Sequence, residues 1–206
     1  MSARIDSINE QRKQKLDRLR ARGINPYPNS YPATHTTRQA IAGLEAREAA
    51  GQTGHDTATV KIAGRVTAMR KMGKASFLDI RDVEGRIQLF IQIGNMDEAH
   101  QELFKDLDIG DFIGIKGFVF RTQMGEISVH AQELTVLSKS LRPLPIVKYK
   151  DGVAYDAFED PEQRYRQRYV DLVVNEGVKA IFLKRTKVFN SMRNFFNEKN
   201  YIEVDT

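Results

Sequence analysis

The middle of the chain alternates apolar and polar residues with a period of two. The alternation begins at Val60, Ile62, Val66 and Ala68, with Gly64 where a barrel strand can bend. Every second side chain of a strand faces the same side. In residues 86–93 the apolar face holds Ile87, Leu89, Ile91 and Ile93, and the other face holds Arg86, Gln88, Phe90 and Gln92. The pattern predicts strands from Val60 and at about 75–82, 86–93, 111–121 and 126–137.

A helical repeat interrupts the strands only once, at about 96–107, where Met96, Ala99, Leu103 and Leu107 share one side. Three strands, a helix and two strands is the order of an OB fold, a small five-stranded Greek-key barrel. The fold class predicted is therefore mainly β with flanking helices. OB barrels bind oligonucleotides on the face of strands 2 and 3 and at the loops after strands 1 and 4. These regions are residues 75–92, 71–74 and 122–126.

Helices are expected on both sides of the barrel. Residues 2–22 carry a thin apolar stripe of Ile5, Ile8, Leu16 and Leu19, and Gly23 with Asn25-Pro26 ends that helix. Further helices are predicted at 37–50, at 164–169 and, as a long amphipathic helix, at 176–199, followed by a strand over 201–206. The domain bounds predicted are a leader at 1–58, the barrel at 59–138, a linker at 139–160 and a last segment at 161–206.

Composition narrows the choice of function. The chain has a net charge of +5 and a pI near 9.4, which suits an anionic partner and equally a soluble surface. It has no cysteine, and its four histidines lack HExxH spacing, so a disulfide framework and a catalytic zinc site are not expected. No signal peptide and no membrane-length apolar run is present, so a cytoplasmic protein without a membrane partner is expected.

The leader helix is strongly basic towards its end. Two interpretations remain open: a solvated helix face, or an arm that contacts nucleic-acid phosphates. The residues concerned are Arg12, Lys13, Lys15, Arg18, Arg20 and Arg22.

Phe77 is the clearest candidate for a binding residue. Strand parity puts Leu78 and Ile80 in the core and Phe77 on the opposite face with Asp79 and Arg81. An aromatic ring among charged groups on an OB barrel can stack on a nucleobase. Gln88, on the polar face of the next strand, offers a donor and an acceptor to a base edge. The alternative is that Phe77 packs beneath the N-terminal loop. Asp79 and Asp82, beside Arg81, are interpreted as surface ion pairs.

Several segments together resemble bacterial lysyl-tRNA synthetases of class II, in order and spacing from about residue 10 onward. Aspartyl- and asparaginyl-tRNA synthetases share the barrel and the Arg-Tyr-x-Asp-Leu stretch but lack the leader helix and the Met-Gly-Lys-Ala-Ser loop. The matching segments are 11–16, 23–28, 72–77, 85–89, 141–145 and 164–172.

The resemblance implies a role in binding the anticodon of tRNA-Lys. The middle uridine would stack on Phe77, and Gln88 would read its edge. Arg70 would lie nearby and Glu126 would contact a flanking base. By simple counting Arg70 has core parity, so a bulge near Gly64 is expected to expose it.

The last segment resembles motif 1 of class II synthetases, a helix and strand at the dimer interface. The resemblance implies a homodimer whose interface includes Val178, Phe182, Phe195 and Phe196. Asn200 stands where the family usually has glycine, and the motif's proline would follow Thr206. The full-length family is an ATP- and magnesium-dependent ligase. Motifs 2 and 3, which hold ATP and the adenylate, lie downstream, so this stretch alone is expected to bind no cofactor and to lack lysine activation.

Two other interpretations are weighed against an anticodon-binding segment of a ligase. One is a free-standing OB module that binds single strands without sequence preference. The other is a dimerising regulatory paralog. Residues 159–206 argue against the free-standing module, which has no use for a motif 1 helix.

Overall fold

The computed structural model describes residues 2–52, 59–73, 75–145, 148–150, 153–155, 158–175 and 177–204. The chain divides into two compact units, one up to Pro143 and one from Leu144. The first unit contains both the segment before the barrel and the barrel itself. The two units are described separately below.

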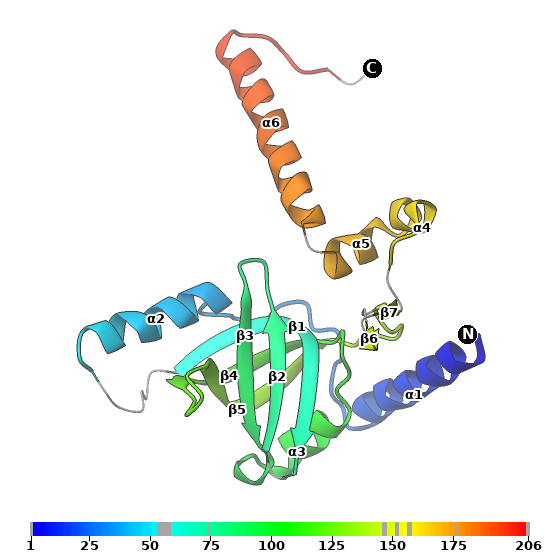
Figure 1. The fold of residues 1–206 in the computed structure, drawn as a ribbon, viewed down its shortest axis with the longest axis vertical. Coiled ribbons are helices and arrows are strands. Elements are labelled where there is room, and N and C mark those ends of the chain that lie inside the picture. The colour runs from blue at the N-terminus through cyan, green and yellow to red at the C-terminus, as the bar shows by residue number, and fades with distance from the viewer. Residues whose placement is uncertain are drawn as a thin grey trace. The chain divides into compact units, whose positions relative to one another are not determined.

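Five strands of the first unit close into a barrel in the order β1-β2-β3-β5-β4 (Figure 1). Strands β3 and β5 pair in parallel and the other neighbours are antiparallel. A short 3₁₀ turn and helix α3, Glu98–Lys105, separate β3 from β4. The predicted OB-fold order is confirmed. The strands are β1 Thr59–Met72, β2 Ala75–Arg81, β3 Arg86–Gln92, β4 Phe112–Arg121 and β5 Ile127–Ser138.

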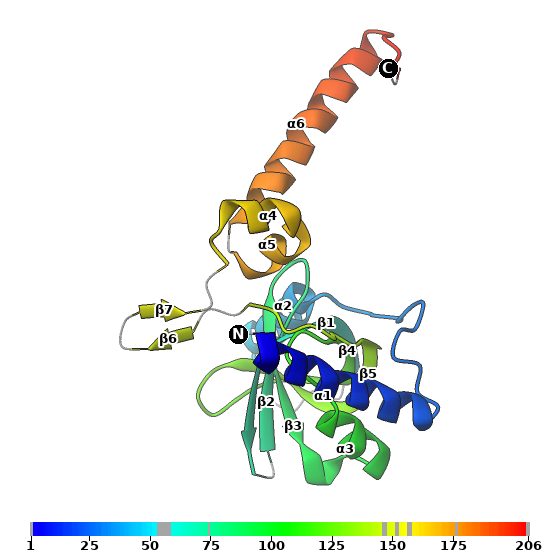
Figure 2. The same ribbon diagram turned by 90° about the vertical axis from the view of Figure 1, so that its right-hand side faces the viewer.

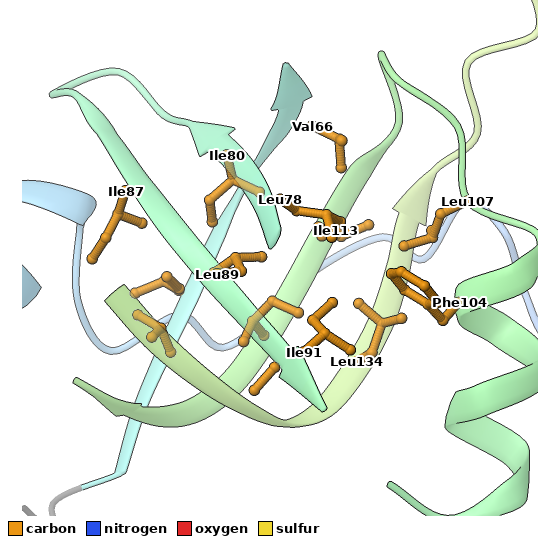
Figure 3. Packing of buried hydrophobic residues seen from close by; sticks show 14 of the residues in the cluster. Val66, Leu78, Ile80, Ile87, Leu89, Ile91, Phe104, Leu107, Ile113 and Leu134 are labelled. Carbon is orange, nitrogen blue, oxygen red and sulfur yellow. The ribbon is translucent and has the colours of Figure 1, made fainter. Parts of the chain in front are cut away.

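The alternating apolar residues of the strands fill the barrel (Figure 3). Phe104 and Leu107, from α3 and the residues after it, join this cluster, as do Leu19, Ala40 and Leu44 from the leader segment. Burying each such side chain contributes roughly 1.5–3 kcal/mol, so this interior is the main source of the unit's stability. Fully buried members include Ile62, Val66, Leu78, Ile80, Leu89, Ile91, Ile113, Ile115 and Val129.

A bulge at Thr67 changes the facing of β1 halfway along the strand. Val66 pairs with Ile80, but Ala68 pairs with Asp79, so Thr67 is the extra residue. Its hydroxyl donates to the carbonyl oxygen of Asp79 over 3.2 Å. Ala68, expected in the core, therefore pairs across the outer face. The bulge lies three residues beyond Gly64, near which it was expected.

Gly64 serves a close approach of backbones instead. A Cβ atom there would lie 3.0 Å from the carbonyl oxygen of Arg81. Gly117 is tighter still, since its Cβ would lie 2.0 Å from the carbonyl oxygen of His130. A side chain at Gly117 would therefore clash with the backbone of β5, and one at Gly64 would fit only if the backbone at Arg81 moved.

Two helices of the leader segment form where they were expected. Helix α1 covers Ser2–Ala21, and Gly23 follows it with a positive φ of 74°. Helix α2 covers Thr37–Ala49 and begins with a capping box between Thr36 and Gln39. Asp82 of the β2–β3 turn accepts hydrogen bonds from the backbone and hydroxyl of Thr37, at 2.7 and 2.8 Å. The start of α2 is thereby tied to the barrel.

Helix α1 lies along the barrel (Figure 2). Charged side chains attach it there. The Lys139 side chain is 0% exposed, and its Nζ lies 2.5 Å from Asp108 and 2.6 Å from Asp111. Lys15 of α1 also donates to Asp108, over 2.6 Å. Arg12, itself buried, donates to the carbonyl oxygens of Ile109, Ser140 and Arg142. Basic groups of the helix are therefore part of the fold.

The second unit contains a small hairpin and three helices. The hairpin, β6 Lys148–Lys150 with β7 Val153–Tyr155, lies in the predicted linker and was not foreseen. The single helix expected at 164–169 is replaced by α4 Pro161–Arg166 and α5 Arg168–Val174, which break at Gln167. The long helix is confirmed as α6, Val178–Glu198.

The strand expected over 201–206 is absent from residues 201–204, and residues 205–206 lie outside the described part of the chain. A strand needs a partner for its backbone groups, and within the described residues no segment pairs with 201–204. That expectation is wrong for the four residues described.

We expect Lys139→Met to lower the free energy of unfolding by about 3–5 kcal/mol, because it leaves the fully buried Asp111 without its cation and removes one of the two lysines that pair with Asp108. The matched control is Lys116→Met, whose partner Glu133 is exposed and whose removal costs less than about 1 kcal/mol. Urea denaturation of the two variants measures the difference. Equal destabilisation would show that the buried position of Lys139 confers no special stability.

The same network predicts a dependence on pH. Burial opposes ionisation of Asp108, yet hydrogen bonds from Lys139 and Lys15 hold its pKa below the ordinary 3.8. A lowered pKa contributes stability above the unfolded value, and this contribution is lost as pH falls through the folded value. We therefore expect the stability of the wild type to fall more steeply below about pH 4 than that of Asp108→Asn. Asp17→Asn, at an exposed pair with a 3.8 Å separation, is the control and should keep the wild-type slope.

Candidate nucleic-acid interface

The outer face of β1, β2 and β3 carries the predicted binding residues in two adjacent rows. Arg70 pairs with Phe77, which pairs with Phe90 on β3. One step along the strands, Asp79 pairs with Gln88, which pairs with Ser128 on β5. Alternate residues of a strand are about 6.6–6.8 Å apart. An aromatic row and a polar row therefore lie side by side on this face, close enough for one nucleobase to contact both.

Phe77 lies on the outer face, as its parity predicted. Its side chain is half-buried, and its ring centroid is 5.3 Å from that of Phe90 at an angle of 44°. Arg70 is exposed at the neighbouring position of β1. The bulge at Thr67 causes this exposure, because it shifts the facing of every later residue of β1. Met69 takes the core position beside Leu78.

Gln88 lies in the polar row but is more covered than strand parity implies, with 6% of its surface exposed. Its Oε1 accepts a hydrogen bond from the Ser128 hydroxyl over 2.9 Å. The bond turns the carbonyl end of the amide towards β5. Among the described residues no acceptor bonds its Nε2, so this donor is available to a ligand. Ser128 was not singled out from the sequence.

Glu126 is exposed at the end of the β4–β5 turn. Its backbone N–H donates to the Thr122 hydroxyl at 3.0 Å, and Gly125 closes the turn with a φ of 86°. Its carboxylate lies 2.7 Å from Nη2 of Arg86. The turn places this carboxylate beside the start of β3, on the side of the polar row.

Asp79 and Asp82 are not the surface ion pairs that the sequence indicated. Asp79 is 7% exposed, and its carboxylate lies 3.4 Å from the Arg86 guanidinium. Burial opposes ionisation of Asp82, but hydrogen bonds from Thr37 and the turn backbone hold its pKa below the usual value. Both carboxylates are covered because neighbouring strands and α2 pack over positions that appear exposed when a strand is considered alone.

Further rings extend the aromatic row across β3, β5 and β4. Phe90 lies 5.2 Å from His130 between ring centroids, and His130 stacks on Phe118 at 4.9 Å and 8°. Phe120 lies 5.9 Å from Phe90. Sequence reasoning missed this cluster. The available signal was the spacing of Phe118 and Phe120, two aromatic residues on the outer parity of one strand.

The basic residues of α1, together with Arg22 directly after it, form two groups. Four have partners in the barrel region: Arg12 bonds backbone carbonyls, Lys15 pairs with Asp108, and Arg18 and Arg22 pair with Asp106. Lys13 and Arg20 are exposed, and Arg20 lies 3.8 Å from Asp17 of its own helix. The first group attaches the helix, which is a role that the basic pattern alone did not reveal.

Of the four residues predicted for a dimer interface, two are covered within the second unit and two are exposed. Val178 is buried within the second unit, and Phe182 lies under the Arg168 guanidinium, 5.4 Å from the ring centroid. Phe195 and Phe196 are exposed and meet edge to face at 5.6 Å. An open apolar depression on α6 is lined by these two rings with Val188, Ser191 and Met192.

The described part of the chain contains no evident metal site. No group of three or more histidine, aspartate or glutamate side chains is placed to hold a metal ion there. None of the helices described is both long and apolar enough to cross a membrane.

Comparison with known proteins agrees with the fold. Residues 60–137 match the family model of the OB-fold nucleic acid binding domain named for the tRNA anticodon, and residues 160–206 match class II tRNA synthetases (D, K and N). A lysine–tRNA ligase of Porphyromonas gingivalis is 56% identical over 201 residues, which is 95% of this chain and 34% of the relative. One from Azobacteroides pseudotrichonymphae is 54% identical over 202 residues, or 95% and 39%.

A third relative, the lysine–tRNA ligase of Christiangramia forsetii, is 49% identical over 203 residues, 95% of this chain and 34% of the relative. The chain thus spans about a third of the length of these relatives. Both family models and the relatives agree with the resemblance carried by the sequence motifs. Over 95% of its length the chain is similar to lysine–tRNA ligases, and it combines an OB-fold nucleic acid binding domain with a segment of class II tRNA synthetases.

Proposed function

We propose that the barrel binds the anticodon loop of tRNA-Lys and that the whole protein attaches lysine to this tRNA. The observation that carries the proposal is the pair of rows on the outer face: aromatic rings in one, and base-edge donors and acceptors in the other. Single-stranded nucleic acids are bound by stacking platforms combined with polar groups of this kind. The matched relatives are named lysine–tRNA ligases.

In this proposal the middle base of the anticodon stacks on Phe77. The ring is half-buried, so it is held in place and still offers a face. Gln88 bonds the edge of the same base through Nε2, which the Ser128 contact leaves available. Arg70, next to Phe77 in register, lies where it can contact the same nucleotide.

Glu126 is proposed to contact a base that flanks the middle one. It lies on the turn after β4, which in OB barrels borders the oligonucleotide face. The pair with Arg86 holds the carboxylate in position before RNA binds. A carboxylate accepts hydrogen bonds only, so it favours a base with an exposed donor.

Helix α1 is proposed to add affinity through phosphate contacts. Lys13 and Arg20 are the cations best placed for this role, because their side chains are exposed and the described residues of the barrel offer them no close partner. The four attached residues, Arg12, Lys15, Arg18 and Arg22, are proposed to contribute mainly by fixing the helix, and any phosphate contact from them is secondary.

The second unit is proposed to belong to the synthetase domain of a homodimeric, cytoplasmic enzyme. Phe195 and Phe196 of α6 are its best candidates for contact with a second subunit, since both rings are exposed. Lysine activation in this family uses ATP and magnesium, and no step of that reaction is assigned to the described residues.

A free-standing OB module or a regulatory paralog is the alternative. The match of residues 160–206 to class II synthetases argues against the free-standing module. Titration of the chain with anticodon stem-loops tests the proposal, because a ligase segment must distinguish the lysine anticodon from others. Equal affinity for all loops would contradict anticodon recognition.

We expect Phe77→Ala to weaken anticodon-loop binding by roughly 1–3 kcal/mol whatever base is in the middle, because every base has a face that can stack. The matched control is Phe189→Ala, which removes an exposed ring from α6. Fluorescence titration at one salt concentration measures the affinities. Thermal unfolding serves as a check: a large fall in melting temperature for Phe77→Ala would make the ring a core residue and remove its stacking role.

We expect the double variant Lys13→Gln with Arg20→Gln to weaken binding of all loops alike. The slope of log affinity against log salt should fall by about 0.7–0.9 for each phosphate that the helix no longer neutralises. The unfolding free energy should stay close to wild type, whereas Arg18→Gln with Arg22→Gln should lower it by leaving the buried Asp106 without either cation. A change in base preference without a change in salt slope would refute the phosphate role.

A further inference from the structure

Asp79 is a buried acid of the outer face whose hydrogen bonding is incomplete. Among the described residues its Oδ1, which is inaccessible to solvent, has no hydrogen-bond partner, and its Oδ2 lies 3.4 Å from Arg86. Asp111, which is fully buried, differs: its oxygens accept from Lys139, from the Ser140 amide and from the Asp108 amide at 2.6–2.8 Å. A buried carboxylate normally accepts hydrogen bonds at both oxygens. No described residue donates to Oδ1 of Asp79, so this oxygen can accept a hydrogen bond from a ligand.

The position of Asp79 indicates where such a donor comes from. It pairs directly with Gln88 across β2 and β3, and it is two residues from Phe77 on the same face. Arg86 is shared, since its other amino group lies 2.7 Å from Glu126. A base stacked on Phe77 and bonded by Gln88 therefore presents its edge beside the Asp79 carboxylate. Because Oδ1 is inaccessible to solvent in this structure, a partial rotation of the carboxylate about its last side-chain torsion brings it to that edge when the base binds.

We propose that Asp79 is a specificity-determining residue that accepts the ring N–H of the middle base and thereby selects uracil. This inference rests on the proposed function, because it assumes that the base lies against Phe77 and Gln88. Uracil presents a donor, N3–H, between two carbonyl acceptors. Its N3–H meets the Asp79 oxygen that lacks a donor, while Nε2 of Gln88 donates to the adjacent carbonyl oxygen.

The same arrangement acts against cytosine. Cytosine has a lone pair at N3, and adenine has one at N1, so each would present an acceptor to a carboxylate that cannot donate. Placing two acceptors together leaves both without a partner in a covered site. Specificity of this kind combines a favourable contact with uracil and a repulsive one with its competitor. An acid beside an anionic RNA is otherwise unfavourable, which is a further reason to expect a donor opposite it.

Asp79→Asn is the direct test, because the amide has the shape of the carboxylate but carries both a donor and an acceptor. The full chain is titrated with anticodon stem-loops that have uridine or cytidine in the middle position. We expect the uridine loop to bind on the order of tenfold more weakly to the variant. The cytidine loop should bind more tightly, because the amide can donate to N3 of cytosine, so the preference for uridine narrows. An unchanged preference would overturn the proposal.

Arg86→Gln separates this role from one exerted through Arg86 and Glu126. It should weaken both loops alike and keep the wild-type preference for uridine. If it narrows the preference as much as Asp79→Asn, then Asp79 acts only by holding Arg86, and the base contact is refuted.

A loop with N3-methyluridine in the middle tests the wild-type protein directly, and so remains decisive if a variant fails to fold. Removing the N3–H should weaken binding to the wild type and cost less with Asp79→Asn. Equal binding of the methylated and unmethylated loops by the wild type would overturn the proposal. Failure of the proposed function looks different: the wild type would show no preference for the lysine anticodon, and Phe77→Ala would leave binding unchanged.

Discussion

The bulge at Thr67 decides which side chains share the outer face of the barrel. Before the bulge β1 turns Ile62 and Val66 inward, and after it Arg70 faces outward beside Phe77. The strand pairs with β4 as far as Arg65 and with β2 from Arg65 onward. Strict alternation would have put the arginine in the core, where an unpaired charge is very costly. The bulged residue is fixed by its own hydroxyl, which bonds the carbonyl of Asp79. The extra residue Thr67 therefore determines which side chains of β1 face the core and which lie beside the aromatic and polar rows.

Most of the charged contacts of helix α1 attach it to the barrel. The stripe of cations on α1 has the spacing of a nucleic-acid arm, yet its inner members face Asp106 and Asp108 and the carbonyls around residue 140. With Lys139 and Asp111 fully buried among them, the network joins the leader helix, the turn after α3 and the end of β5. Buried pairs of this kind are costly to break from one side. They fix the position of the helix, while Lys13 and Arg20 on its outer side stay exposed.

The strand order, the two flanking helices and the outward position of Phe77 could be predicted, because each depends on a period within a single segment. What could not be predicted depends on neighbours. Asp79 and Gln88 have surface parity, but the adjacent strands and their side chains cover them. The rings of Phe90, Phe118 and His130 meet only once β3, β5 and β4 are in register. The break at Gln167 and the absence of a strand at 201–204 likewise reflect packing and pairing partners that local periodicity does not contain.

The proposed recognition residues lie on two kinds of backbone, paired strands and an exposed turn, which differ in rigidity. Phe77, Asp79 and Gln88 lie on central strands whose backbones are paired on both sides, so their positions follow those of the barrel. Glu126 lies at the end of a turn, where backbone pairing is local and exposure is high. A protein rejects a base with the wrong donors and acceptors only if its own hydrogen-bonding groups cannot move to form other contacts with that base. Under the proposed binding mode, this geometry favours strict selection of the base placed against the strands and a more tolerant contact with the base placed against the turn.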